Sequence, residues 1–105
     1  MDKNKVKEIL NVSSVFASPK RMLLLEFFSQ GPKKWADMNA FFNEELKIPT
    51  SVSEVYKHIH VLEDHDYVVK KGTRFIITKK GKVAIDLAKQ IANTDPKIPK
   101  VEFEF

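Results

Sequence analysis

A run of purely basic charged groups lies between residues 67 and 82. This stretch holds six basic residues and no acidic one: Lys70, Lys71, Arg74, Lys79, Lys80 and Lys82. The first three surround Gly72, and cations on a tight turn are placed to contact the phosphate groups of a polyanion. Lysine-rich edge strands also protect sheets from aggregation, which gives the same residues a second interpretation.

A second set of polar side chains falls on one face of the segment 51–65. At about 100° per residue, one side of a helix here carries Val52, Val55, Ile59 and Leu62, and the opposite side carries Ser53, Glu54, Lys57, His60 and Val61. Serine and lysine donate hydrogen bonds and glutamate accepts them, so this outward face can recognise polar groups. A solvated surface explains the face equally well. The segment is not basic, because it contains one lysine and three acidic residues, Glu54, Glu63 and Asp64.

The histidines and the lack of cysteine give little support to metal binding or catalysis. His58 and His60 point in different directions on a helix, and His58 and His65 lie roughly 10 Å apart along its axis. The chain has no cysteine, no glycine-rich phosphate loop and no nucleophile signature. The sequence therefore predicts a protein that is not an enzyme and that needs no metal or other cofactor.

Apolar spacing and turn residues predict the elements that position these groups. Helices are expected over about 3–16, 20–30, 35–46 and 51–65 and after residue 78, with a β-hairpin over 67–77. Ser18-Pro19 begins the second helix and Gly31-Pro32 ends it. Thr50 or Ser51 caps the fourth helix, and Thr78 caps the last. The predicted fold class is α+β, mostly α, with five helices and a two-stranded hairpin.

Length and composition favour one domain with an anionic partner. The chain has 105 residues, 43% of them hydrophobic, and a net charge of +4, which suits a single core. We expect a domain over residues 1–92 and a tail over 93–105. No apolar run approaches the roughly 20 residues of a membrane span, and the first residues lack the apolar core of a secretory signal. These features predict a cytoplasmic protein without a membrane partner.

The two charged sets lie in a stretch that resembles winged helix-turn-helix transcriptional regulators. Residues 50–68, TSVSEVYKHIHVLEDHDYV, look like a recognition helix and its exit turn. Residues 75–82, FIITKKGK, resemble the second wing strand and the start of the final helix. The arsenic-repressor and multiple-antibiotic-resistance groups are the most similar kinds, over about residues 18–92. Two features differ from these groups. Asp66 stands where they usually have glycine, and the chain lacks the cysteine pair with which the arsenic-repressor group senses metals.

The resemblance implies a sequence-specific transcriptional regulator that binds double-stranded DNA. Helix 35–46 would brace helix 51–65 in the major groove, while the hairpin, or wing, contacts the phosphate backbone. The candidate DNA contacts are Thr50, Ser51, Ser53, Glu54, Lys57, Lys70, Lys71, Thr73 and Arg74, with Lys33 and Lys34 at the start of the bracing helix. Relatives bind an effector near a dimer interface, and the sequence leaves open whether this chain has one.

The terminal helices carry more apolar surface than one thin domain needs. The residues concerned are Val6, Ile9, Leu10, Ile85, Leu87 and Ile91. They predict a homodimer with two recognition helices about one DNA turn apart, or they close the core of the monomer. Val101, Phe103 and Phe105 alternate with glutamates in the tail, as in a strand that lies against the domain or a partner subunit.

Two further alternatives concern function. The aromatic residues Trp35, Phe41, Phe42, Phe27 and Phe28 suggest a ligand-binding box, but their helical spacing favours the core. The same scaffold also serves as a winged-helix protein–protein interaction module in transcription or processing assemblies. The modest negative charge of residues 51–65 supports that alternative.

Overall fold

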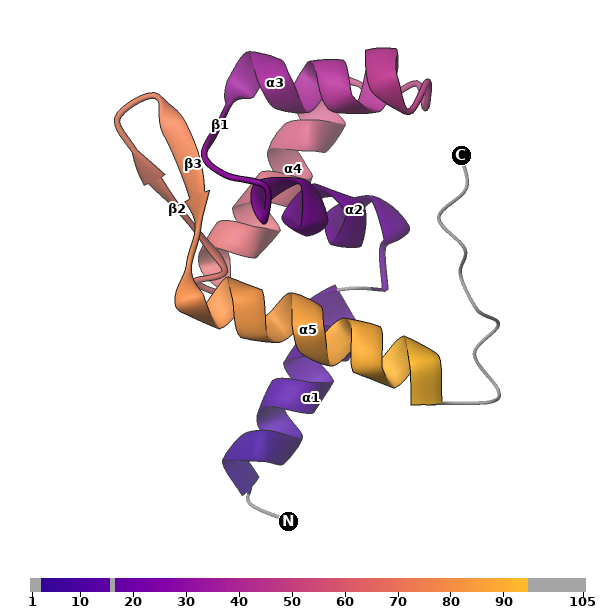
Figure 1. The fold of residues 1–105 in the computed structure, drawn as a ribbon, viewed down its shortest axis with the longest axis vertical. Helices are drawn as coiled ribbons and strands as arrows, with labels where there is room; N and C mark the ends of the chain where they lie inside the picture. Colours follow the sequence, from indigo (N-terminus) through magenta and orange to yellow (C-terminus); the bar gives the residue numbers. More distant parts are fainter. Residues whose placement is uncertain (1–2, 16, 95–105) are drawn as a thin grey trace.

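The computed structural model describes residues 3–15 and 17–94 (Figure 1). Its helices are α1 (Lys3–Val15), α2 (Pro19–Phe28), α3 (Trp35–Ala40), α4 (Val52–Asp64) and α5 (Lys79–Thr94), and α3 continues into a π-helical turn, η1 (Phe41–Glu45). The strands are β1 (Lys33–Lys34), β2 (Val68–Lys71) and β3 (Arg74–Ile77). The α+β, mostly α class and the predicted order of elements are confirmed. Residues 95–105 of the predicted tail lie outside the described residues.

The sheet has three strands where the sequence predicted two. Both neighbours of β3 run antiparallel to it, which gives the strand order β1-β3-β2. Lys33 and Lys34, predicted as the start of a helix, form β1 instead. A two-residue strand is too short to show the alternation by which strands are recognised, so only its pairing partner defines it.

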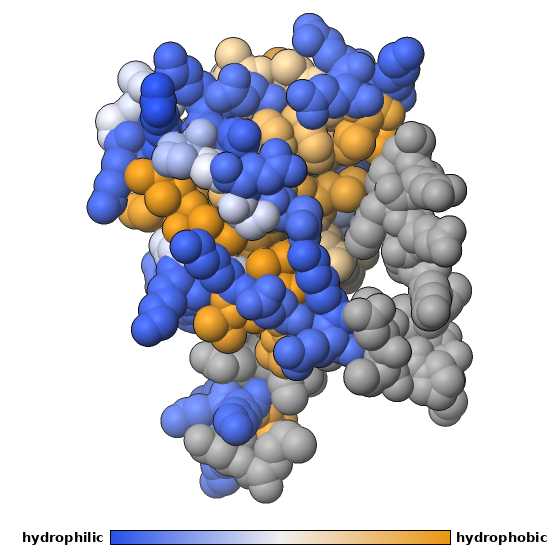
Figure 2. Space-filling view, in the orientation of Figure 1, coloured by the Kyte–Doolittle hydropathy of each residue, from blue (hydrophilic) through white to orange (hydrophobic). Residues whose placement is uncertain are grey.

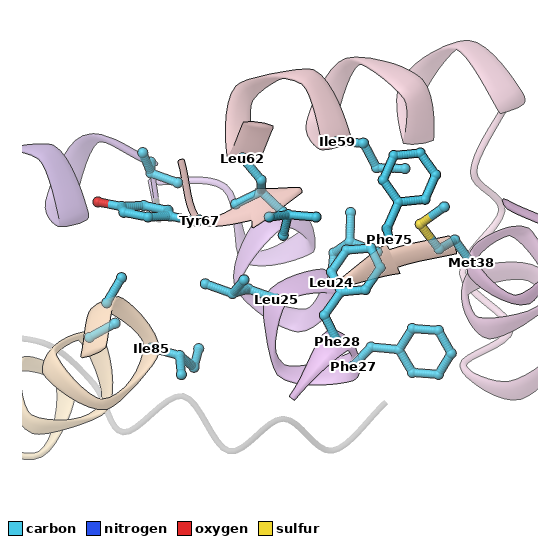
Figure 3. Close-up of a cluster of buried hydrophobic side chains, with 14 of the residues drawn as sticks. Leu24, Leu25, Phe27, Phe28, Met38, Ile59, Leu62, Tyr67, Phe75 and Ile85 are labelled. Atoms are coloured by element: carbon cyan, nitrogen blue, oxygen red, sulfur yellow. The ribbon is translucent and has the colours of Figure 1, made fainter. Parts of the chain in front are cut away.

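The core is built around α2. Its buried residues are Leu23, Leu24, Leu25, Phe27 and Phe28. Figure 3 shows Phe28 among Leu24, Phe75 and Met38, and its ring lies 6.3 Å from that of Phe75 on β3. The helix therefore joins the sheet to α3 and α4, because all of them pack against the same side chains.

Local hydrogen bonds fix the ends of the helices much as the sequence predicted. The Ser51 Oγ accepts a hydrogen bond of 3.1 Å from the Glu54 amide, and the Thr78 Oγ1 accepts one of 3.0 Å from the Gly81 amide. The Ser18 side chain makes no such cap, although its residue precedes the first turn of α2. Asp66, which stands where the similar regulators have glycine, has φ of 60°, a left-handed conformation that Asp adopts more readily than most residues.

The start of α5 is locked to the end of α4, and this contact sets the base of the hairpin. Thr78 donates from its hydroxyl to the Asp66 carbonyl at 2.6 Å and from its amide to the Tyr67 carbonyl at 3.0 Å. Gly81 lies so close that an added Cβ would overlap the Tyr67 carbonyl oxygen and approach Ile77 Cγ1 to 2.8 Å. Glycine is therefore required here by close approach of the backbone.

The structure corrects two predicted positions: Val52 was predicted to face the core, and Ile85 was predicted at a dimer interface. Val52 is 60% exposed, because the first turn of α4, with the exposed Ser51 and Ser53, projects beyond the core. Ile85, assigned to a dimer interface, is 3% exposed within the core of the single chain. No helix among residues 3–15 and 17–94 is long and apolar enough to cross a lipid bilayer.

Candidate nucleic-acid interface

One stripe of α4 is open to solvent. Its members are Ser53, Tyr56, Lys57 and His60, all exposed, at the i, i+3, i+4 and i+7 spacing of one helix face. The predicted outward face contained three of them but omitted Tyr56, whose side chain is 55% exposed. Val61, predicted on this face, is half-buried and packs against the core. We call these four residues the α4 stripe.

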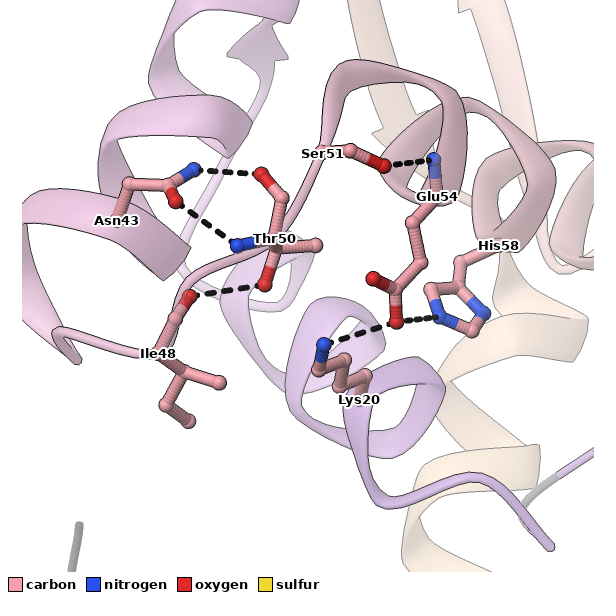
Figure 4. A network of polar contacts seen from close by, with 7 residues as sticks. All are labelled: Lys20, Asn43, Ile48, Thr50, Ser51, Glu54 and His58. Atoms are coloured by element: carbon pink, nitrogen blue, oxygen red, sulfur yellow. Dashed lines mark hydrogen bonds and ion pairs between the residues drawn. The ribbon is translucent and has the colours of Figure 1, made fainter.

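Glu54 is turned away from the α4 stripe toward α2 (Figure 4). The Lys20 ammonium donates to Glu54 Oε1 at 2.8 Å, and His58 Nε2 lies 3.6 Å from the same oxygen. The carboxylate predicted to contact DNA is thus engaged in an ion pair with another helix of the same chain. Its charge is balanced by Lys20, which is far away in the sequence, so the acidity counted for segment 51–65 overstates the charge that the stripe presents.

Thr50 belongs to the turn before α4 rather than to an exposed surface. It is 7% exposed, and its hydroxyl donates to the Ile48 carbonyl at 2.9 Å. The Asn43 side chain accepts from the Thr50 amide at 2.9 Å and donates to the Thr50 carbonyl at 3.0 Å (Figure 4). The sequence did not single out Asn43, yet this two-bond clasp sets where α4 begins.

The register of the sheet brings three cations side by side. Arg74 on β3 pairs with Lys34 on β1 and with Lys71 on β2. Residues directly opposite in antiparallel strands point to the same face, with Cβ atoms about 4.5–5.5 Å apart. All three are exposed, and no carboxylate among the described residues forms an ion pair with them. We call these three residues the cationic row.

The cationic row lies on the solvent face of the sheet, because the next residue of β3, Phe75, is buried on the opposite face. Like charges directly opposite one another are destabilising, and a bound polyanion would remove that repulsion. Lys33 and Lys70 are not part of the row, because they pair with Phe75 and lie on the same face of the sheet as its ring. The Lys33 ammonium lies 4.4 Å from the centroid of the Phe27 ring, and that of Lys70 lies 5.7 Å from the Phe75 ring.

A groove joins the hairpin to the α4 stripe. Its volume is about 330 Å³, and its lining residues are Trp35, Tyr56, Lys70, Gly72, Thr73 and Phe75. We call it the aromatic groove. Trp35 is half-buried here rather than enclosed in the core as predicted. The hairpin turn therefore stands next to Tyr56, and Figure 2 shows mostly hydrophilic side chains over the hairpin and α3, with hydrophobic atoms between them.

At each of the two titratable groups beside the α4 stripe, His58 and Glu54, burial and the neighbouring opposite charge shift the pKa in opposite directions. Desolvation lowers the pKa of His58 below its ordinary value of 6.5, against the opposing effect of the nearby Glu54 carboxylate. The hydrogen bond from Lys20 lowers the pKa of Glu54 below 4.5. The unfolded chain therefore binds more protons than the folded one at both groups as the pH falls.

We expect the free energy of unfolding to decrease as the pH falls through about 6.5, because only the unfolded His58 becomes protonated there. A further decrease below pH 4.5 should follow as Glu54 is protonated. Urea unfolding between pH 8 and pH 5, roughly spanning the histidine range, would measure the first step. His58→Gln should flatten it, and an unchanged slope in that variant would contradict the assignment.

Comparison with known proteins identifies no relative. No family model matches the chain, and neither a curated protein nor a solved structure matches it. Among the described residues, no three histidine or acidic side chains gather as metal ligands. The inference of function therefore depends on the geometry of α4 and the sheet.

Proposed function

We propose that this protein is a cytoplasmic winged-helix transcriptional regulator that binds double-stranded DNA. In this proposal α4 enters the major groove and the hairpin lies against the phosphate backbone. One observation carries it: Tyr56 of the α4 stripe borders the same groove as Lys70, Gly72 and Thr73 of the hairpin, while the cationic row lies on the opposite, solvent-exposed face of the same sheet. A helix beside unpaired cations is suited to a groove flanked by phosphates.

The individual contacts follow from the exposed side chains at the start of α4. A major groove about 12 Å wide admits a helix, and base edges there offer donors, acceptors and thymine methyl groups. Ser53 and Lys57 are exposed and can donate to bases or phosphates, and the exposed Val52 can pack against a thymine methyl. The cationic row supplies contacts to the backbone that carry no sequence information.

The support for the competing proposal, a protein–protein interaction module, is reduced. That support was the negative charge of segment 51–65, but Glu54 is paired with Lys20 at 2.8 Å. Glu63 and Asp64 lie in the last turn of α4, beyond the α4 stripe. The α4 stripe contains Lys57 and no carboxylate, which fits a polyanion better than a basic protein surface.

A homodimer through α1 and α5 is part of the proposal. Val6 and Val83 remain 39% and 54% exposed, so each of these helices retains apolar surface. Leu87 is half-buried, and the side chains of Ile9, Leu10 and Ile91 lie outside the described residues. Light scattering should give about twice the 12.1 kDa of one chain. A mass of one chain at high concentration would contradict the dimer.

The direct test is a fluorescence-polarisation titration with mixed duplex DNA at two salt concentrations. We expect binding that weakens steeply with salt, because phosphate contacts release counterions. Ser53→Ala and Lys57→Ala should alter the preference among sequences by about 1–3 kcal/mol at the contacted base pairs, if these side chains read base edges. Absence of duplex binding at low salt would refute the proposal and leave the interaction module in its place.

A further inference from the structure

The aromatic groove has two ring walls from different helices. Trp35 comes from the start of α3 and Tyr56 from α4, with ring centroids 5.6 Å apart and an angle of 71° between the rings. The His60 ring also lies against Tyr56, at 4.2 Å, yet Tyr56 remains 55% exposed. Exposed rings held by neighbouring rings offer a fixed apolar surface to a planar partner.

The hairpin turn forms the opposite side of the groove. Lys70, Gly72 and Thr73 contribute a cation, a backbone segment and a hydroxyl, and Phe75 adds a third apolar ring. The volume of about 330 Å³ lies at the lower end of the range of about 300–1,000 Å³ that small-molecule sites occupy. The groove therefore suits a single planar group rather than a helix or a strand of another protein.

One cation, Lys70, lines the aromatic groove itself. Lys57, which follows Tyr56 on α4, is exposed, and Lys71 and Arg74 lie on the opposite face of the hairpin. Aromatic rings alternating with cations are how proteins hold unpaired nucleic acid strands, since bases stack on the rings and phosphates follow the cations. This charge complementarity favours a nucleotide over an uncharged aromatic molecule.

We propose that the aromatic groove holds one unpaired nucleobase of the bound DNA. The base stacks on the exposed Tyr56 ring with its edge toward Trp35, and the adjoining phosphates lie along the hairpin turn. This inference rests on the proposed DNA binding, because both contacts use the same surface. It gives the protein a preference for DNA with an unpaired nucleotide, at an overhang or an opened base pair, over a fully paired duplex.

Two labelled DNAs that share one duplex would test the proposal, one blunt and one with a short single-stranded thymine overhang. Stacking of a base on an aromatic ring is worth about 1–3 kcal/mol, so the overhang DNA should bind roughly 5- to 150-fold more tightly. Trp35 is the single tryptophan of the chain. Its fluorescence should therefore be quenched by the overhang DNA much more than by the blunt duplex.

Variants at Tyr56 separate stacking from other effects on binding. Tyr56→Leu keeps an apolar side chain but removes the ring, and it should bring the two affinities to the same value. Tyr56→Phe keeps the ring and should preserve their ratio. The ratio is the readout, because any general change in duplex affinity affects both DNAs equally. Thermal unfolding of both variants would confirm that they fold.

The possible results distinguish this inference from the duplex-binding proposal. Equal affinities of the unmodified protein for the two DNAs would overturn the inference alone. An unchanged ratio of overhang to blunt affinity in Tyr56→Leu would also overturn it. Loss of the ratio in Tyr56→Phe would also overturn it, because the hydroxyl rather than the ring would then be responsible. Binding to neither DNA would overturn both proposals.

Discussion

Replacing the cationic row with glutamine, as Lys34→Gln, Lys71→Gln and Arg74→Gln together, is expected to weaken binding to every duplex roughly 100-fold at low salt. The estimate takes about 1 kcal/mol for each phosphate contact and converts the sum to an affinity ratio. The slope of log affinity against log salt should fall by about 2 to 3, since each contact contributes about 0.9. Polarisation titrations at several salt concentrations would measure both values.

The same triple variant should be at least as stable as the unmodified protein. Arg74 faces Lys34 and Lys71 directly, so glutamines remove repulsion between neighbouring strands. This combination, weaker binding with undiminished stability, separates an interface from a structural role. A matched control replaces three exposed lysines of α1 by glutamine: Lys3, Lys5 and Lys7. Equal losses of affinity in both variants would show a dependence on net charge alone and would contradict the role of the row.

Phe28→Ala is expected to lower the free energy of unfolding by about 3–5 kcal/mol, the usual cost of emptying a buried phenylalanine site. Phe28 is 0% exposed and packs between α2 and β3, where its ring lies 6.3 Å from that of Phe75. Since domains are stable by about 5–15 kcal/mol, the variant should lose a large part of its stability. Urea unfolding followed by circular dichroism would measure the change.

Val52→Ala provides the control, because the sequence predicted a buried Val52 and the structure exposes 60% of it. A surface substitution of this kind should change the free energy of unfolding by no more than about 0.5 kcal/mol. A cost of about 1 kcal/mol or more, typical of a buried valine, would show that the first turn of α4 packs as the helical wheel predicted. Phe28→Ala with a cost below about 1 kcal/mol would contradict the described core.

Elements defined by local chemistry were predictable from the sequence. Helix periodicity identified α2 and α4, and Gly72 identified the hairpin turn. Thr78 was predicted as a cap, and so was one of Thr50 and Ser51, of which Ser51 is the cap; the hydroxyls of Ser51 and Thr78 accept from amides only three residues away. In each case the determining contacts lie within a few residues, so composition and spacing were sufficient.

The candidate site was only partly predictable. The sequence identified Lys34, Lys71 and Arg74 as cations but gave no means of knowing that they share one row, since that depends on the pairing of β1 with β3. Tyr56 was not predicted as part of the candidate site, because the residue is uncharged and was assigned to neither face of helix 51–65. What identifies Tyr56 as a site residue is its exposed ring beside Trp35. This contact joins two different helices, so the sequence does not show it.

The sequence by itself determined which segments are helical, where the hairpin turns and that its turn is basic, because short-range hydrogen bonds and apolar periodicity decide these features. Only the tertiary structure decided where the side chains of those segments point. Lys20 draws Glu54 toward α2, and the sheet aligns Arg74 with Lys34. Such contacts join residues that are distant along the chain, and no local pattern records which distant residue will be the neighbour.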